Sequence, residues 1–154
     1  MTQLRARDVM SSDVTVISPK AFVVDAARMM LERRITGLPV VDDSGKLVGL
    51  ISEGDLLRRV EIGTDTQSTD AFFSFELARQ FLKSHGRYVE DVMTTKVTSV
   101  LANTPLAEIA QLMQLMRLKR VPVTDHGKVV GVVSRTDVLR VLVNSMHASE
   151  TGAA

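Results

Sequence analysis

The chain has 154 residues and a formal net charge of +1 at pH 7, and 45% of its residues are hydrophobic. The hydrophobic content predicts a globular, cytoplasmic protein and argues against disorder. The near-neutral charge argues against general attraction to nucleic acid or an acidic membrane. No apolar run approaches the roughly 20 residues that cross a bilayer. The lack of cysteine excludes disulfides, a thiolate nucleophile and a cysteine zinc site, and the N-terminus lacks the apolar stretch of a secretion signal.

Two stretches of the chain carry similar residues in the same order, and their offset stays constant until a turn that is one residue shorter in the second copy. Chance does not keep such a register, so we interpret the chain as a duplication. The matching segments are Asp8–Met10 with Asp91–Met93, Val14–Thr15 with Val97–Thr98, Leu38–Asp42 with Val121–Asp125, Gly45–Gly49 with Gly127–Gly131, and Ser52–Arg58 with Ser134–Arg140.

Each copy is predicted to fold as strand, helix, strand, strand and helix. In the first copy, a β-rich run at 14–17 precedes a helix over 22–35 with apolar residues at helical spacing. Two β-branched strands follow, joined by a hairpin turn at 42–45, and the last helix starts at Ser52.

In the second copy, Thr104 is expected to cap the first helix and Pro105 to be its first residue. The hairpin turn lies at 125–127, and the last helix starts at Ser134.

These elements predict an α+β fold of two βαββα repeats, at 8–60 and 91–143. One repeat is too small to bury both faces of its sheet, so we expect the two to pack sheet to sheet with pseudo-twofold symmetry. Residues 61–90 are expected to form a linker with a phenylalanine-rich helix, which either covers the core or makes an oligomer contact. Residues 144–154 are expected to be a flexible tail, and the methionines to fill the core.

Nothing in the sequence predicts catalysis. Neither of the two common glycine-rich phosphate loops occurs, and the three histidines lack metal-ligand spacing. The neighbouring carboxylates of Asp42 and Asp43 lie in a predicted hairpin turn, where such residues are expected without any ligand. The protein is therefore expected not to be an enzyme and to hold no metal site of its own.

A serine followed three residues later by an aspartate starts the last helix of both copies, as Ser52 and Asp55 and as Ser134 and Asp137. This pattern is a capping box, which stabilises a helix start by about 1 kcal/mol without a ligand. The same geometry suits a nucleotide, because amides at a helix start attract anions and a carboxylate accepts the hydroxyls of a ribose. The residues alone leave both interpretations open.

The order Asp-Val-Met, then Gly-Leu-Pro-Val-Val-Asp, then Gly-Leu-Ile-Ser-Glu-Gly-Asp-Leu-Leu resembles the CBS domain, named for cystathionine β-synthase. A tandem pair of CBS domains is called a Bateman module, and this chain is similar to stand-alone bacterial-type CBS-pair proteins over nearly its whole length. The resemblance implies a disc-like homodimer and an adenosine ligand: AMP, ADP, ATP, an NAD-type nucleotide, S-adenosylmethionine or cyclic di-AMP. Some CBS pairs bind nothing known.

In that family the aspartate of one repeat holds a ribose, together with the first strand and the segment before the proline of the other repeat. The resemblance therefore implies one site made of Met10, Thr15, Thr36, Gly37, Leu38, Pro39, Ser134, Thr136 and Asp137. It implies a second site made of Ser52, Asp55, Met93, Thr98, Lys119, Arg120, Val121 and Pro122.

The two implied sites differ in charge. Where the first copy has Thr36 and Gly37, the second has Lys119 and Arg120, which are either solvated or contact phosphate. Their bulk crowds the adenine slot of the second site, so we expect the Asp137 site to be the better one.

The main hypothesis is a regulatory, energy-sensing module that binds an adenine nucleotide, with or without Mg²⁺, requires no cofactor and acts on an unidentified effector protein. The alternative is a dimeric interaction scaffold whose clefts bind no ligand. A third hypothesis, nucleic-acid binding through Arg117, Lys119 and Arg120, is disfavoured by the near-neutral net charge.

Overall fold

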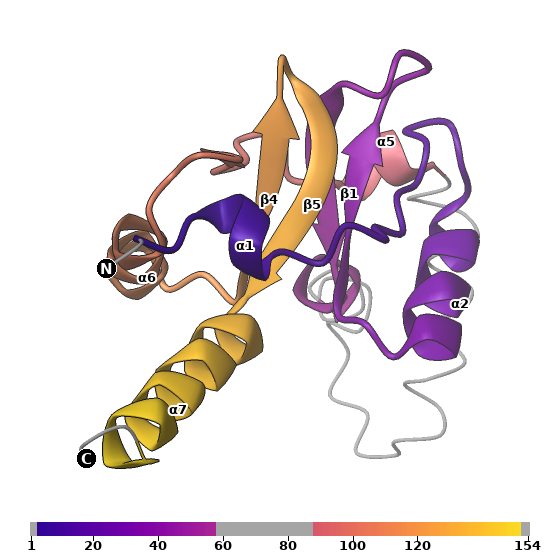
Figure 1. The fold of residues 1–154 in the computed structure, drawn as a ribbon. Coiled ribbons are helices and arrows are strands. Elements are labelled where there is room, and N and C mark those ends of the chain that lie inside the picture. The colour runs from indigo at the N-terminus through magenta and orange to yellow at the C-terminus, as the bar shows by residue number, and fades with distance from the viewer. Residues whose placement is uncertain (1–2, 58–87, 152–154) are drawn as a thin grey trace, which may run out of the picture. The chain divides into compact units, whose positions relative to one another are not determined.

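The computed structural model describes residues 3–57 and 88–151, with side chains as far as Ala148. The chain divides into two compact units. Figure 1 shows the chain coloured by residue number. Residues 15–97 form one, here called the repeat-1 unit, and residues 1–14 with 98–154 form the other, the repeat-2 unit. The first residues of each predicted repeat, 8–14 and 91–97, thus belong to the compact unit that the rest of the other repeat forms.

The repeat-1 unit contains α2 (Val23–Arg33), β1 (Gly37–Val41), β2 (Leu47–Ser52) and α5 (Val89–Val92), and residues 53–57 are helical. Strands β1 and β2 are antiparallel, with Gly37 opposite Ser52 and a bulge between Val40 and Val41. The expected first strand is reduced to one parallel bridge from Ile17 to Val40.

The repeat-2 unit contains α1 (Ala6–Val9), β3 (Val100–Leu101), α6 (Leu106–Met116), β4 (Arg120–Asp125), β5 (Lys128–Ser134) and α7 (Arg135–Thr151). Its sheet has the order β3-β4-β5, with β3 parallel and β5 antiparallel to β4. In Figure 1 the chain passes directly from β5 into α7, which places the start of this helix at the end of the sheet.

The duplication extends to the details of the backbone. Both α2 and α6 end on an arginine in the left-handed conformation, Arg34 with φ 55° and Arg117 with φ 53°. The β4–β5 hairpin has a bulge between Val123 and Thr124, the position that matches the bulge in β1. These shared irregularities confirm the two βαββα repeats that the sequence predicts.

The hairpin turns are also where the sequence places them. Asp42 accepts hydrogen bonds at Oδ1 from the backbone N–H groups of Ser44 and Lys46, both at 2.9 Å, and from the Ser44 hydroxyl at 2.7 Å. Gly45 then takes a φ of 89°, which glycine adopts without strain. The side-chain hydrogen bond from Ser44, followed by the backbone bond from Lys46, lowers the pKa of Asp42 from its usual range.

Each unit has its own apolar core, formed by its strands and the inner faces of its helices. The repeat-1 core contains Ile17, Val23, Ala26, Met30, Leu38, Val40, Ile51, Val89 and Val92, and the repeat-2 core contains Ala6, Val100, Ile109, Met113, Val121, Val123, Val133 and Val138. Met30 and Met113 fill core positions, as the sequence predicts, but Met116 and Met146 are 52% and 64% exposed.

A methionine from the first residues of one repeat packs against a strand glycine of the other repeat in each unit. A Cβ built on Gly49 would lie 2.5 Å from Sδ of Met93, and one built on Gly131 would lie 2.8 Å from Cγ of Met10. Beside these contacts, Thr94 exchanges backbone hydrogen bonds with Leu50, and Ser11 with Val132. Both glycines are therefore sites of close approach, which explains why neither position carries a side chain.

Two further local expectations differ from the structure. Pro105 is the extended N-cap of α6 instead of its first residue, and the Thr104 hydroxyl accepts the N–H of Leu101 at 3.0 Å because the chain turns there before the helix. The expected tail is helical as far as Thr151, since no proline or glycine interrupts the sequence before Gly152. The expected phenylalanine-rich helix lies outside the described residues.

No helix in the described part of the chain is long and apolar enough to span a membrane.

Candidate functional site

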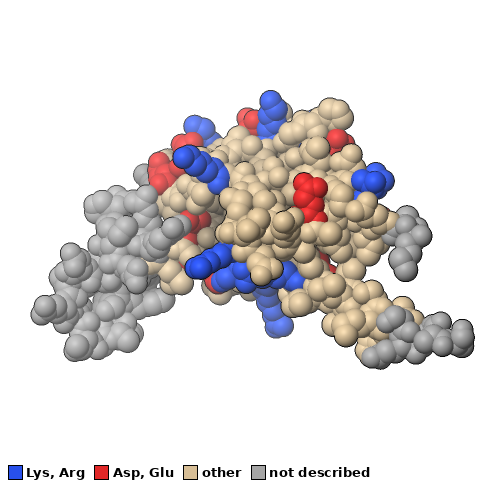
Figure 2. All heavy atoms as spheres, turned by 90° about the vertical axis from the view of Figure 1, so that its left-hand side faces the viewer, with Lys and Arg blue, Asp and Glu red and all other residues tan. Residues whose placement is uncertain are grey.

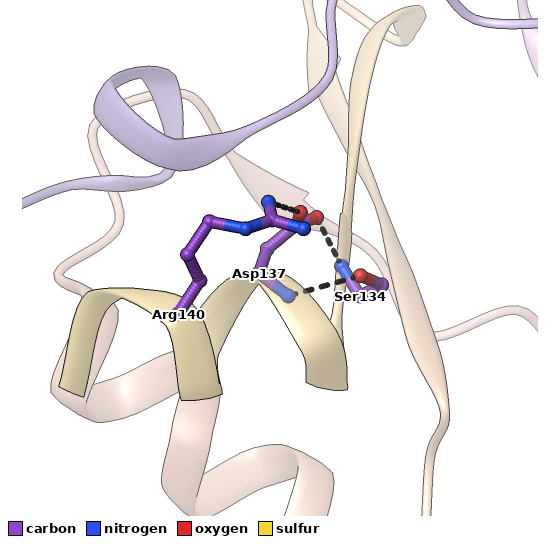
Figure 3. A network of polar contacts seen from close by, with 3 residues as sticks. All are labelled: Ser134, Asp137 and Arg140. Atoms are coloured by element: carbon purple, nitrogen blue, oxygen red, sulfur yellow. Dashed lines mark hydrogen bonds and ion pairs between the residues drawn. The ribbon is translucent and has the colours of Figure 1, made fainter. Parts of the chain in front are cut away.

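The start of α7 carries a polar network of three residues, drawn in Figure 3. The N–H of Ser134 donates to Oδ2 of Asp137 at 2.8 Å, and the N–H of Asp137 donates to the Ser134 hydroxyl at 3.1 Å. This reciprocal pair is the capping box that the sequence predicts. The guanidinium of Arg140, one helical turn further on, donates from Nη1 to Oδ1 of Asp137 at 3.3 Å.

The matching position in the repeat-1 unit is held differently. Asp55 accepts the N–H of Ser52 at 2.9 Å and its hydroxyl at 3.1 Å, both on Oδ2, and accepts the Thr94 hydroxyl on Oδ1 at 3.2 Å. The N–H of Asp55 returns a 3.3 Å hydrogen bond to the Ser52 hydroxyl. Thr94 directly follows the repeated segment Asp91–Met93, so the position of this segment helps to hold the Asp55 carboxylate in place.

The two aspartates also differ in burial. Asp55 is 5% exposed as a whole residue, whereas the side chain of Asp137 is 13% exposed and that of its partner Arg140 is 64% exposed. A hydroxyl ligand would have to displace the part-buried Thr94 hydrogen bond at Asp55 but only a solvent-exposed guanidinium at Asp137. The carboxylate of Asp137 is therefore the more accessible acceptor.

The segment before each proline lies beside the helix start of its own repeat. Glu53 donates its N–H to the carbonyl of Thr36 at 3.0 Å, and Arg135 donates its N–H to the carbonyl of Lys119 at 3.0 Å. Register pairs Gly37 with Ser52 and Arg120 with Ser134.

Each unit thus gathers part of the implied site residues. The repeat-1 unit holds Thr15, Thr36, Gly37, Leu38, Pro39, Ser52, Asp55 and Met93, and the repeat-2 unit holds Met10, Thr98, Lys119, Arg120, Val121, Pro122, Ser134, Thr136 and Asp137.

Leu38 and Val121 belong to the apolar cores of their units and have no exposed surface. Their side chains are committed to packing, so these positions have only backbone groups left to offer a ligand. The pairing of Asp137 with Thr15 and residues 36–39, and of Asp55 with Thr98 and residues 119–122, joins residues of different units and remains a prediction.

Basic side chains surround the start of α7. Arg117, Lys119 and Arg135 are exposed, and none of them forms an ion pair within the part of the chain that the structure describes. Arg135 is held over the preceding turn, where its Nε donates to the carbonyl of Leu118 at 2.7 Å. Figure 2 shows Lys and Arg side chains both low on the face that it presents and along its upper edge. The helix start adds its own partial positive charge, so the surroundings of Asp137 favour an anion.

Sequence reasoning missed Thr94 and Arg140. Signals for both were present, because a hydroxyl residue follows each Asp-Val-Met segment and an arginine stands three residues after each aspartate. An arginine at that spacing lies on the same helix face as the aspartate. Among residues 3–57 and 88–151, no three His, Asp or Glu side chains lie together as a metal site.

The fold and the two helix starts define a class of protein: a duplicated βαββα chain with a capped aspartate at the last helix of each repeat. The family model for the CBS domain matches residues 6–62 and 89–144. The chain belongs to the CBS-domain family.

Individual relatives agree with this assignment. The chain is 34% identical over 146 residues to the chloroplastic CBS domain-containing protein CBSX2 of Arabidopsis thaliana, covering 88% of this chain and 61% of that protein. It is 28% identical over 149 residues to the CBS domain-containing protein YhcV of Bacillus subtilis, covering 96% and 90%. The chain thus spans less than two thirds of the length of the chloroplastic relative.

A solved structure of CBSX2 in complex with AMP matches the fold with a TM-score of 0.74 and 31% sequence identity, covering 91% of this chain and 97% of that chain.

Proposed function

We propose that this chain is a regulatory module that binds an adenine nucleotide, with Asp137 holding the ribose. The observation that carries the proposal is the Asp137 carboxylate, which is fixed by Ser134 at the start of α7 and paired otherwise only to a solvent-exposed arginine in the described contacts. The similarity to CBSX2, which has been crystallised with AMP, supports an adenosine ligand.

The rest of the site follows from the family pattern. The cleft between the two repeats would supply Thr15 and the backbone of residues 36–39 to the adenine, and Thr136 and the amides at the start of α7 to the phosphate. The ligand is AMP, ADP or ATP, with an NAD-type nucleotide or S-adenosylmethionine as alternatives, and binding would alter the contacts of a homodimer with an effector protein. No step of this function requires catalysis by the chain.

The geometry favours the Asp137 site over the Asp55 site. Asp55 is 5% exposed, and both of its oxygens are occupied by hydroxyl or amide donors from Ser52 and Thr94. Breaking the Asp137–Arg140 contact costs little, because the guanidinium is 64% exposed and water solvates it when the contact is lost.

Titration calorimetry of nucleotide-free protein against AMP, ADP, ATP, NAD and S-adenosylmethionine tests the proposal. Asp137→Asn keeps a carbonyl oxygen for the N–H of Ser134 but removes the charge and one acceptor, so affinity should fall about tenfold or more. Asp55→Asn is the matched control and should leave the tightest binding step unchanged. Equal losses in the two variants, or no binding by the unaltered chain, would refute the assignment.

A dimeric interaction scaffold is the second candidate, and the surface of α7 favours it. Leu139, Leu142 and Val143 lie on one helical face and are 60%, 52% and 52% exposed. This face suits a second copy of the chain.

Denaturing extraction of freshly purified protein followed by mass spectrometry separates the candidates. A co-purifying nucleotide supports the sensor. A protein free of nucleotide, whose dimer is lost in Leu142→Glu, supports the scaffold.

A further inference from the structure

Arg140 occupies the acceptor that a ribose needs. Its Nη1 lies 3.3 Å from Oδ1 of Asp137, while Oδ2 of the same carboxylate already accepts the N–H of Ser134 at 2.8 Å, as Figure 3 shows. A ribose diol that uses both carboxylate oxygens therefore meets Arg140 at Oδ1. The guanidinium must then share this oxygen or turn away from it.

Turning away is easy for this side chain. Arg140 is 64% exposed, lies one helical turn after Asp137 and makes no other ion pair within residues 3–57 and 88–148. An ion pair with so exposed a cation is weak, so a ligand displaces it at small cost.

A displaced guanidinium needs another anion nearby. Arg117, Lys119 and Arg135 already make this end of the repeat-2 unit positive, and Arg135 is tied to the turn before β4 through the carbonyls of Leu118 and Lys119. A neutral nucleoside would cover Asp137 and leave Arg140 among like charges. A ligand that carries phosphate would instead pair with it, since the planar guanidinium binds phosphate with two parallel hydrogen bonds.

We propose that Arg140 is a specificity-determining residue that makes the Asp137 site select phosphorylated adenosine ligands over adenosine itself. This inference rests on the proposed function. In the free protein Arg140 pairs with Oδ1 of Asp137. When a ligand binds, the ribose takes over this oxygen, and the guanidinium pairs with the ligand phosphate instead. One residue thereby couples recognition of the sugar to recognition of the phosphate.

The test compares the dissociation constants of AMP and adenosine for the full chain at low ionic strength, where charge contacts are least screened. Arg140→Gln removes the charge but keeps a polar side chain of similar reach. It should weaken AMP binding about tenfold or more, the value of one charge-assisted contact. Adenosine binding should be unchanged or tighter, because nothing then competes for Asp137. Arg140→Lys should retain part of the preference for AMP.

Lys128→Gln is the matched control. It removes the same charge from the same unit, but Lys128 begins β5 and Ser134 ends it, about 20 Å away along the strand. The ratio of the two dissociation constants should not change in this variant. Equal weakening of AMP and adenosine by Arg140→Gln would show a merely structural role and overturn the inference, as would an unchanged ratio. Failure of the unaltered chain to bind either compound would overturn the proposed function as well.

Discussion

Gly131→Ala tests whether the N-terminal segment is part of the repeat-2 unit. A Cβ on Gly131 would lie 2.8 Å from Cγ and 3.0 Å from Cβ of Met10, and closer still to its Sδ. A change of rotamer can relieve the contacts with Sδ and Cγ, but Cβ of Met10 stays at 3.0 Å, so the backbone must also give by a few tenths of an ångström. Two 3.0 Å hydrogen bonds between Ser11 and Val132 oppose this movement.

The cost follows from the tightness of the contact. Overpacking a site by one methyl group destabilises a protein by about 1–3 kcal/mol, which lowers the melting temperature by roughly 2–4 °C per kcal/mol in a chain of this size. Met10→Ala should be mildly destabilising alone, since Met10 is only partly buried. In the double variant the methyl group occupies the space left by Sδ and Cγ of Met10, and only the 3.0 Å contact with the retained Cβ remains. The double-mutant cycle should therefore show a favourable coupling of about 1 kcal/mol.

Urea denaturation of the four proteins measures these values, and hydrogen exchange of the Ser11 and Val132 amides reports whether the segment detaches. Gly54→Ala is the control, because its Cβ would meet only the Ser52 hydroxyl at an ordinary 3.6 Å. Additive effects of the Gly131 and Met10 substitutions, or normal stability of Gly131→Ala, would show that the N-terminal segment does not pack as described.

Three further predictions follow from the same structure. Gly54→Ala should raise the free energy of unfolding by about 0.5–1 kcal/mol, because this exposed helical glycine lacks helix propensity; a decrease would contradict the helix at 53–57. Asp55→Ala should cost about 1–3 kcal/mol, since Ser52 and Thr94 lose the buried carboxylate that accepts their hydrogen bonds. Asp137→Ala should cost less, because it loses a cap worth about 1 kcal/mol. A reversed order in urea denaturation would contradict this difference. The lowered pKa of Asp42 means that its contribution to stability is complete above its unfolded pKa of about 3.9 and is lost as the pH falls through the folded value. Asp42→Asn should therefore be destabilising at pH 7 and lose its effect in acid, and pH-independent destabilisation would refute the turn geometry.

The repeats, the hairpins and the capped helix starts could be predicted because each depends on residues close together in sequence. Ser134 and Asp137 are three positions apart, and the capping box follows from that spacing alone. The turn at Asp42 likewise follows from Asp, Ser and Gly in order. Local chemistry determines these features.

Features that depend on contacts between distant segments could not be predicted in the same way. The assignment of residues 1–14 to the repeat-2 unit arises from packing of Met10 on Gly131, more than a hundred residues away along the chain. In the repeat-1 unit, backbone hydrogen bonds between Thr94 and Leu50 bring Thr94 close enough to donate its hydroxyl to Asp55. Asp55 therefore accepts a threonine hydroxyl, whereas Asp137 pairs with an arginine. The two Ser-x-x-Asp patterns are identical and do not predict this difference.

A crystal structure of the chain grown with AMP tests the central claim most directly. The account predicts both ribose hydroxyls within hydrogen-bond distance of the Asp137 carboxylate, with Arg140 turned from Oδ1 toward the phosphate. AMP bound with its ribose on other residues, while Asp137 still pairs with Arg140, would contradict it.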